Sequence, residues 1–144
     1  MTIIHGDILD FTNGYLLHQV NAIGVAGKGL ALALRLRYPE AFIPYVDFCR
    51  SFKEQSLGEY VMGGRQPRIV HIIGQPRPGP CTDYAAAERA MKEFAERNLR
   101  QIPVAVPFGM GCGLGGGDWA IYSQILERHL PKALVYKKSA QPTR

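Results

Sequence analysis

Apolar positions along the chain follow two alternating patterns, short runs of β-branched residues and longer stretches with helical spacing. The short runs predict strands at residues 1–4, 15–20, 59–62, 68–73, 103–107 and 133–136. The longer stretches predict helices at residues 27–38, 40–52, 83–98 and 119–130. Strands and helices that alternate in this way predict an α/β domain, a three-layer α/β/α sandwich with a central mixed sheet.

The helix at residues 83–98 has the clearest pattern. Thr82 or Asp83 can cap its amino end, and four apolar residues fall on one helical face, namely Ala87, Met91, Phe94 and Ala95. The predicted strands at 68–73 and 103–107 are apolar almost throughout. Continuous apolar strands are typical of a sheet covered on both faces, so we expect these two strands near its centre.

Length and composition narrow the class of protein. The chain has 144 residues, of which 47% are hydrophobic, and a formal net charge of +5, so predominant disorder is excluded. We expect a single domain, with its core at about residues 1–137 and a short basic tail at 138–144. The longest apolar runs fall far short of the ~20 residues of a membrane span. The first residues also lack a signal-peptide pattern, and we expect no membrane partner. The odd number of dispersed cysteines is typical of a reduced compartment, so we expect a cytoplasmic protein.

Cysteines and histidines are scattered along the chain. Cys49, Cys81 and Cys112 stand 32 and 31 residues apart, which fits neither a C-x-x-C site nor a disulfide framework. The four histidines are equally dispersed, so we expect no metal and no cofactor. The mild positive charge permits an anionic partner but does not require nucleic acid, and no basic–aromatic interleaving supports a dedicated nucleic-acid protein.

Two glycine-rich segments, at residues 21–29 and 108–118, each follow a predicted strand and precede a predicted helix. Ligands of open α/β sheets bind beyond the carboxyl ends of the strands, where glycines expose backbone amides and helix amino ends attract anions. Neither segment matches the dinucleotide fingerprint or a P-loop, and either alone is compatible with a simple tight turn. Together they predict a site that holds a diphosphate from both sides.

Three motifs, in this order, make the chain resemble a macrodomain, the ADP-ribose-binding α/β/α module. They are Gly6-Asp7-Ile8, the segment 20–31 that contains Gly-Lys-Gly, and the segment 107–119 that contains Gly-Cys-Gly-Leu. The resemblance covers nearly the whole chain. Within the family, the chain looks most like the branch of terminal ADP-ribose–protein glycohydrolases and DNA ADP-ribosyl glycohydrolases. A second similarity is to the small ADP-ribose 1″-phosphate phosphatases.

The resemblance implies a partner, ADP-ribose or a derivative of it, including ADP-ribosylated protein or nucleic acid. Asp7 and the backbone of Ile8 would hold adenine, and Asn21 would contact the distal ribose. The other implied ligand-binding residues belong to the glycine segments: Gly24, Gly27, Gly29, Phe108, Gly111, Cys112, Gly113, Leu114 and Gly115. Local alternatives stay open, because Asp7 also suits a cap and Asn21 also suits an Asx turn.

The resemblance also implies a hydrolase that acts at the distal ribose, as an ADP-ribose 1″-phosphate phosphatase or an ADP-ribosyl hydrolase. The candidate catalytic residues are Asn21, His18, Lys28 and Asp118. Each has a structural alternative: His18 as a core histidine, Lys28 as a solvated side chain and Asp118 as a helix cap. A non-catalytic module that binds ADP-ribose, a reader, is the alternative function. We favour the enzyme, because a reader usually brings a second, attached module to its target and these 144 residues are expected to form one domain.

Two departures from the glycohydrolase pattern bear on mechanism. The catalytic lysine of that branch follows the strand that here is predicted to end at residue 73, where this chain has Gly74-Gln75-Pro76. The acidic residue that follows Gly-Cys-Gly-Leu in the protein-deribosylating member is Gly115 here. A covalent mechanism through lysine is therefore disfavoured.

Overall fold

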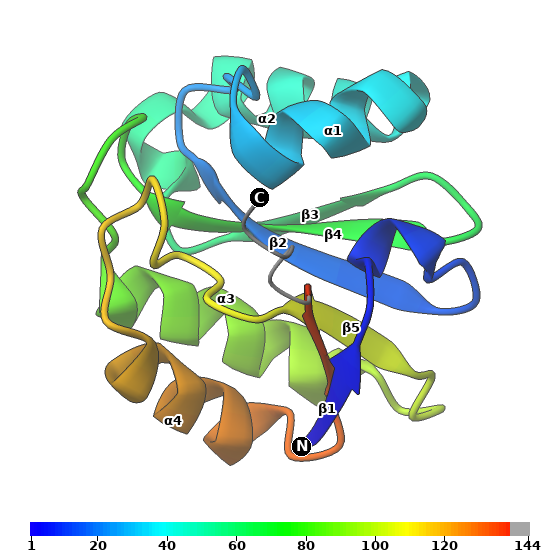
Figure 1. Cartoon of the computed structure of the whole chain (residues 1–144). Helices are drawn as coiled ribbons and strands as arrows, with labels where there is room; N and C mark the ends of the chain where they lie inside the picture. Colours follow the sequence, from blue (N-terminus) through cyan, green and yellow to red (C-terminus); the bar gives the residue numbers. More distant parts are fainter. Residues whose placement is uncertain (139–144) are drawn as a thin grey trace, which may run out of the picture.

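A six-stranded sheet forms the middle of the protein in the computed structural model, which describes residues 1–138 (Figure 1). Its strands are β1 (Thr2–His5), β2 (Tyr15–Asn21), β3 (Tyr60–Gly63), β4 (Arg68–Gln75), β5 (Val104–Pro107) and β6 (Leu134–Lys137). Their order across the sheet is β1-β6-β5-β2-β4-β3, and every pair is parallel except β3 with β4. All six predicted strands are found, and the mixed sheet is confirmed.

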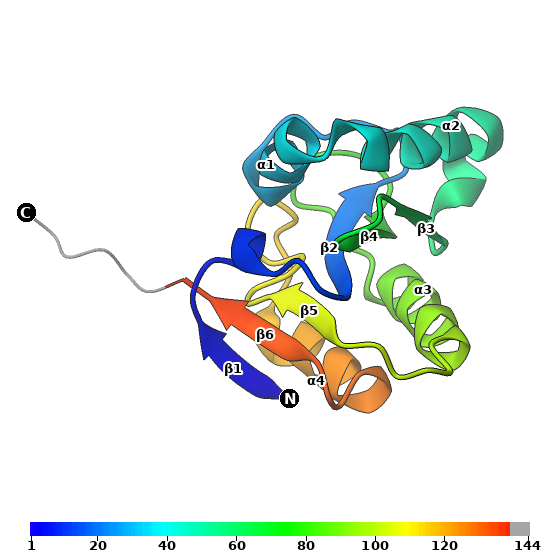
Figure 2. The ribbon, with the colours of Figure 1, turned by 90° about the vertical axis from the view of Figure 1, so that its right-hand side faces the viewer.

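Four helices cover the two faces of the sheet (Figures 1 and 2). Helices α1 (Gly29–Arg37) and α2 (Ile43–Phe52) lie on one face, and α3 (Tyr84–Arg97) and α4 (Trp119–His129) lie on the other. Three short 3₁₀ turns lie between elements of the fold: η1 (Ile8–Asp10) between β1 and β2, η2 (Pro39–Phe42) between α1 and α2, and η3 (Lys53–Ser56) between α2 and β3. The three-layer α/β/α prediction is confirmed.

The helix predicted at residues 40–52 is divided in the structure. Its first residues form η2, and the α-helix itself begins only at Ile43. Pro44 explains this division, because its nitrogen carries no hydrogen to donate to the carbonyl of Glu40. Proline is well tolerated in the first turn of a helix, which is where α2 places it.

The core has two layers, one on each face of the sheet. Successive residues of β2 point to opposite faces, so Leu17 packs toward α3 and α4 and Leu16 toward α1 and α2. Strand β4 is buried from Ile69 to Gln75, as expected for a strand covered on both faces. Of the predicted basic tail, only residue 138 is described, and residues 139–144 lie outside the described part of the chain.

No helix within residues 1–138 is both long enough and apolar enough to span a bilayer. The same residues contain no group of three or more metal-ligating side chains.

His18 and His71 form a buried pair between the sheet and the α1–α2 layer. Nε2 of His71 lies 2.9 Å from the carbonyl oxygen of Ala41, and a carbonyl only accepts, so this nitrogen carries a hydrogen. In the neutral ring Nδ1 of His71 is then an acceptor, and Nε2 of His18 donates to it over 2.8 Å. The rings also pack against Phe42 and Tyr45. Burial lowers the pKa of both histidines, that of His71 to about 4.

These two histidines should make the folded state sensitive to acid. An unfolded histidine has a pKa near 6.5, so the unfolded chain takes up protons first as the pH falls. The stabilisation is complete above pH 6.5 and is lost progressively between pH 6.5 and about 4, with His71 alone contributing roughly 3 kcal/mol. Urea unfolding at several pH values should show this fall in His5→Gln, an exposed control, and a smaller fall in His71→Gln. A flat free energy of unfolding between pH 7 and 5 would contradict the assignment.

Candidate functional site

Three adjoining cavities lie beside the carboxyl ends of β2 and β5. The Asp7 cavity, of about 360 Å³, is lined by residues that include Asp7, Ile8, Leu30, Phe108 and Tyr136. The central cavity, of about 340 Å³, is lined mainly by residues 28–31 and 107–115, and the Asn21 cavity, of about 390 Å³, by residues 19–21, 25–28 and 78–80. Neighbouring cavities share lining residues, so they form one groove, and each has the size of a ligand pocket.

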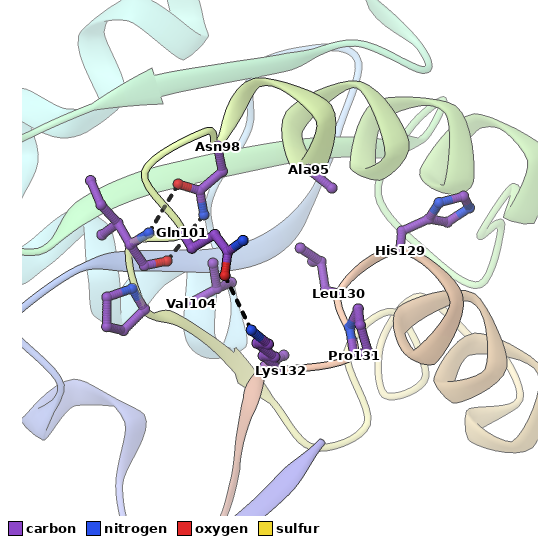
Figure 3. A pocket seen from close by; sticks show the side chains of 11 residues that line it. Ala95, Asn98, Gln101, Val104, His129, Leu130, Pro131 and Lys132 are labelled. Carbon is purple, nitrogen blue, oxygen red and sulfur yellow. Dashed lines mark hydrogen bonds between the residues drawn. The ribbon is translucent and has the colours of Figure 1, made fainter.

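A further cavity, of about 270 Å³, lies at the opposite edge of the sheet, beside the amino ends of β5 and β6 (Figure 3). Polar side chains around it are already bonded to the protein. The Asn98 side-chain amide donates to the carbonyl of Ile102 and accepts from its backbone amide. Lys132 donates to Oε1 of Gln101. The groove at the carboxyl ends is therefore the better candidate for a ligand site.

Helix α1 presents an uncapped amino end to the groove. The side chains of Asp83 and Asp118 cap α3 and α4, whereas the residue at the cap position of α1 is Lys28, whose side chain makes no capping bond. Lys28, Leu30 and Ala31 all line the groove. The free amides of a first helical turn carry partial positive charge. An anion in the groove can therefore accept the hydrogen bonds that no capping side chain accepts at the amino end of α1.

The second glycine segment faces α1 across the central cavity. Within residues 1–138, the amides of Gly113, Leu114 and Gly115 have no hydrogen-bond partner. The carbonyl of Gly111, in contrast, accepts from the amide of Gly117 and from the hydroxyl of Thr82. The segment is thus anchored through a carbonyl while three consecutive amides stay available, an arrangement that suits a phosphate group.

Asn21 ends β2 at the floor of the Asn21 cavity. Its Oδ1 accepts from the amides of Ile23 and Val25, and its Nδ2 donates to the carbonyl of Val25 over 2.7 Å. The hydroxyl of Tyr45 donates to the backbone carbonyl of Asn21 over 2.7 Å. The Asn21 side chain therefore makes the Asx turn that the sequence left open. An amide nitrogen has two hydrogens, so one remains for a ligand.

Asp7 and Phe108 lie at the other end of the groove. Oδ1 of Asp7 caps η1 through the amide of Leu9, and Oδ2 lies 3.6 Å from the ammonium of Lys138. The Phe108 ring packs on Trp119, with the ammonium of Lys137 4.5 Å from its centre. Asp7 thus combines a capping bond with a carboxylate oxygen at the cavity, and Phe108 offers a partly exposed aromatic face.

Most predicted ligand-binding residues line the groove, but three predicted site residues do not. Gly24, Cys112 and Asp118 are absent from the lining, and Asp118 instead caps α4 through the amide of Ala120. The His18 ring is bonded to His71 in the core, although the residue borders the central cavity. For His18 and Asp118 the geometry matches the structural alternatives.

Cys112 is poorly suited to act as a nucleophile. Its thiol donates to the carbonyl of Met110 and packs against the α3–α4 layer of the core. Burial and the negative charge of Asp118 raise the pKa of the Cys112 thiol, so it stays protonated near neutral pH.

The sequence assigned no role at the site to three polar residues, Gln19, Thr82 and Tyr122, of which Gln19 lines two of the cavities. Gln19 and Thr82 bond each other, and the Tyr122 hydroxyl bonds Gln19. A glutamine within the apolar run of β2 was the one available signal. Gln75, which belongs to the segment Gly74-Gln75-Pro76 at the end of β4, also bonds Gln19.

No model of a protein family matches the sequence. A curated relative, the DNA ADP-ribosyl glycohydrolase of Mycobacterium tuberculosis, is 35% identical over 128 residues, which cover 84% of this chain. The chain spans little more than a third (36%) of that relative's length.

Solved structures share the fold. The macrodomain of Mycobacterium tuberculosis DarG is 28% identical, with a TM-score of 0.78 and 97% of both chains covered. Thermosipho africanus DarTG, solved in complex with ADP-ribose, is 24% identical, with a TM-score of 0.78 over 99% of this chain and 42% of that one.

Substitution by alanine should change the stability of the protein at one glycine of the second segment and not at another. A Cβ on Gly111 would lie 2.5 Å from the Tyr122 ring, and the backbone there has a φ of +74°. A Cβ on Gly113 meets nothing within 4 Å, and its φ is ordinary. Gly111→Ala should therefore lower the free energy of unfolding by roughly 2 kcal/mol or more, and Gly113→Ala should leave it within about 0.5 kcal/mol. The free energy of unfolding of both variants is measured by urea titration. Equal changes in the two variants would show that the segment is packed differently.

Proposed function

We propose that this chain, which belongs to the macrodomain family, binds ADP-ribose along the groove. One observation carries the proposal: the uncapped amino end of α1 and the three free amides of Gly113, Leu114 and Gly115 line the same cavity. Backbone amides from two sides match a diphosphate, which has acceptors in every direction. The DarTG structure with ADP-ribose, which shares this fold, supports the choice of ligand.

The ends of the groove set the direction of the ligand. Asp7 presents a carboxylate oxygen that accepts a hydrogen bond from the exocyclic amine of adenine, and Phe108 flanks the same cavity. The distal ribose then lies in the Asn21 cavity, where the remaining Nδ2 hydrogen of Asn21 donates to a ribose hydroxyl. Lys28, which borders both this cavity and the central one, adds positive charge beside the distal phosphate.

The proposed reaction is hydrolysis of the bond between the distal ribose and an attached group. Water adds to C1″, the bond from C1″ to the attached group breaks, and the leaving group takes up a proton. Asn21 orients the ribose, and the Lys28 ammonium stabilises negative charge that develops on the leaving group. ADP-ribosylated DNA is the proposed substrate because the relative with 35% identity is a DNA ADP-ribosyl glycohydrolase.

A second candidate function is the binding of ADP-ribose without turnover. Among the described residues that line the Asn21 cavity, Lys28 is the sole titratable side chain. Acid–base catalysis at the distal ribose therefore has few protein groups to draw on, and this observation supports the reader as the second candidate. Turnover separates the two functions.

Binding is tested by Gly113→Val. Its side chain enters the central cavity, where the phosphate must approach, while the open space around Gly113 keeps the fold intact. Calorimetry should show a loss of ADP-ribose affinity of about 100-fold or more, with a smaller loss for Gly113→Ala, and the free energy of unfolding should stay close to wild type. A folded Gly113→Val protein with unchanged affinity would refute the placement of the diphosphate.

Turnover is tested with three substrates, ADP-ribosylated DNA, ADP-ribosylated protein and ADP-ribose 1″-phosphate, with release of ADP-ribose measured for each. The DNA substrate should react fastest, and Asn21→Ala should lower kcat by on the order of 100-fold while weakening ADP-ribose binding less. Borohydride should trap no sugar adduct, because no lysine follows β4. Release from none of the three, with ADP-ribose still bound, would establish the reader instead.

A further inference from the structure

We propose that Gln19 is a positioning residue that holds two segments of the groove wall, residues 111–117 and 77–80, through a relay of hydrogen bonds, a role that deepens the proposed function and rests on it. The relay consists of four side chains, Tyr122, Gln19, Thr82 and Gln75. It begins beneath the groove on α4 and ends on three backbone carbonyls in the segments that form the walls.

The central part of the relay uses the whole Gln19 amide. Its Oε1 accepts from the Tyr122 hydroxyl over 2.8 Å. Its Nε2 donates to Oε1 of Gln75 over 2.9 Å and to Oγ1 of Thr82 over 2.8 Å. Both hydrogens of the amide are therefore used within the protein.

The outer part of the relay reaches two segments of the groove wall, residues 111–117 and 77–80. The Thr82 hydroxyl donates to the carbonyl of Gly111 over 2.7 Å, which anchors the segment whose free amides face the ligand. Nε2 of Gln75 donates to the carbonyls of Arg77 and Gly79 over 2.8 and 3.2 Å. Residues 78–80 line the Asn21 cavity, so this second branch holds the wall beside the distal ribose.

The direction of every bond is fixed from the ends inward. The backbone carbonyls only accept, so the atom of Gln75 that meets them is its NH₂ group and its Oε1 faces Gln19. Gln19 must then turn its own NH₂ group to Gln75, which leaves Oε1 for the Tyr122 hydroxyl. If either glutamine turned its amide around, its oxygen would face another acceptor: Oε1 of Gln75 in the case of Gln19, and the backbone carbonyls in the case of Gln75.

Close packing couples the relay to the backbone above it. A Cβ on Gly111 would lie 2.9 Å from Oε1 of Gln19, and one on Gly115 would lie 2.6 Å from Oγ1 of Thr82. A Cβ on Gly74 would lie 2.5 Å from Oε1 of Gln19. The glycines thus rest directly on the relay, so a displaced Gln19 side chain shifts the loop that carries the phosphate-binding amides.

The relay is tested by variants that remove one hydrogen-bonding group each. Tyr122→Phe and Thr82→Val should each weaken ADP-ribose binding about 10-fold, whereas Thr82→Ser keeps the hydroxyl and should bind nearly as well as wild type. Tyr60→Phe is the matched control, since its hydroxyl accepts from Arg97 at the carboxyl end of α3, outside the relay.

Coupling identifies Gln19 as the link. The effects of Tyr122→Phe and Thr82→Val on ADP-ribose affinity should be non-additive in the wild-type background, because these side chains connect through Gln19. They should become additive when Gln19→Glu, which has no N–H group, is added. Additive effects with Gln19 present, or equal losses for Thr82→Ser and Thr82→Val, would overturn the proposal.

A measurement without ligand keeps this proposal separate from the proposed function. The Gly117 amide donates to the carbonyl of Gly111, so its hydrogen exchange reports how firmly that wall is held. Exchange should be at least 10-fold faster in Tyr122→Phe and unchanged in Tyr60→Phe, and an unchanged rate in Tyr122→Phe would overturn the relay. If wild-type protein failed to bind ADP-ribose, the proposed function would fall while this exchange experiment still decided the relay.

Discussion

The parting of β2 from β5 is the constraint on which the site depends. The two strands are paired only at Tyr15–Val104 and Leu16–Ala105, whereas β2 is paired with β4 from Tyr15 to Asn21. The chain leaves β2 toward α1 on one face and leaves β5 toward α4 on the other. This divergence opens the groove between the two glycine segments, as expected where connections from neighbouring strands run to opposite faces.

The hydrophobic pattern was sufficient to predict the architecture and the position of both glycine segments. Burial on two faces leaves a strong signal in strands such as β4, because nearly every residue must be apolar. The start of α2 escaped prediction because the effect of Pro44 depends on a single missing donor within an otherwise helical pattern. The Gln19 relay escaped because it joins residues more than 50 positions apart, and sequence spacing does not record such contacts.

Individual site residues were harder to predict because one residue type serves two purposes. Asn21 suits both a ribose contact and an Asx turn, and the structure shows the turn while leaving one hydrogen unused. Asp118 suits both a carboxylate at a reaction centre and a helix cap, and it is bonded as a cap. His18 suits both an acid–base group and a core residue, and only its contacts with His71 and Phe42 separate the two. Residue type alone therefore predicts which interactions a side chain can make, but not which of them it makes in the folded protein.

The uncapped amino end of α1 has a thermodynamic consequence for the whole molecule. Without a bound anion, the helix begins at Gly29 with first-turn amides that no side chain satisfies. In the proposed complex a diphosphate completes this helix, and anything that binds the folded state alone shifts the folding equilibrium by mass action. If the proposed function holds, the ligand is therefore a missing part of the fold, and the free energy of unfolding rises with the concentration of free ADP-ribose.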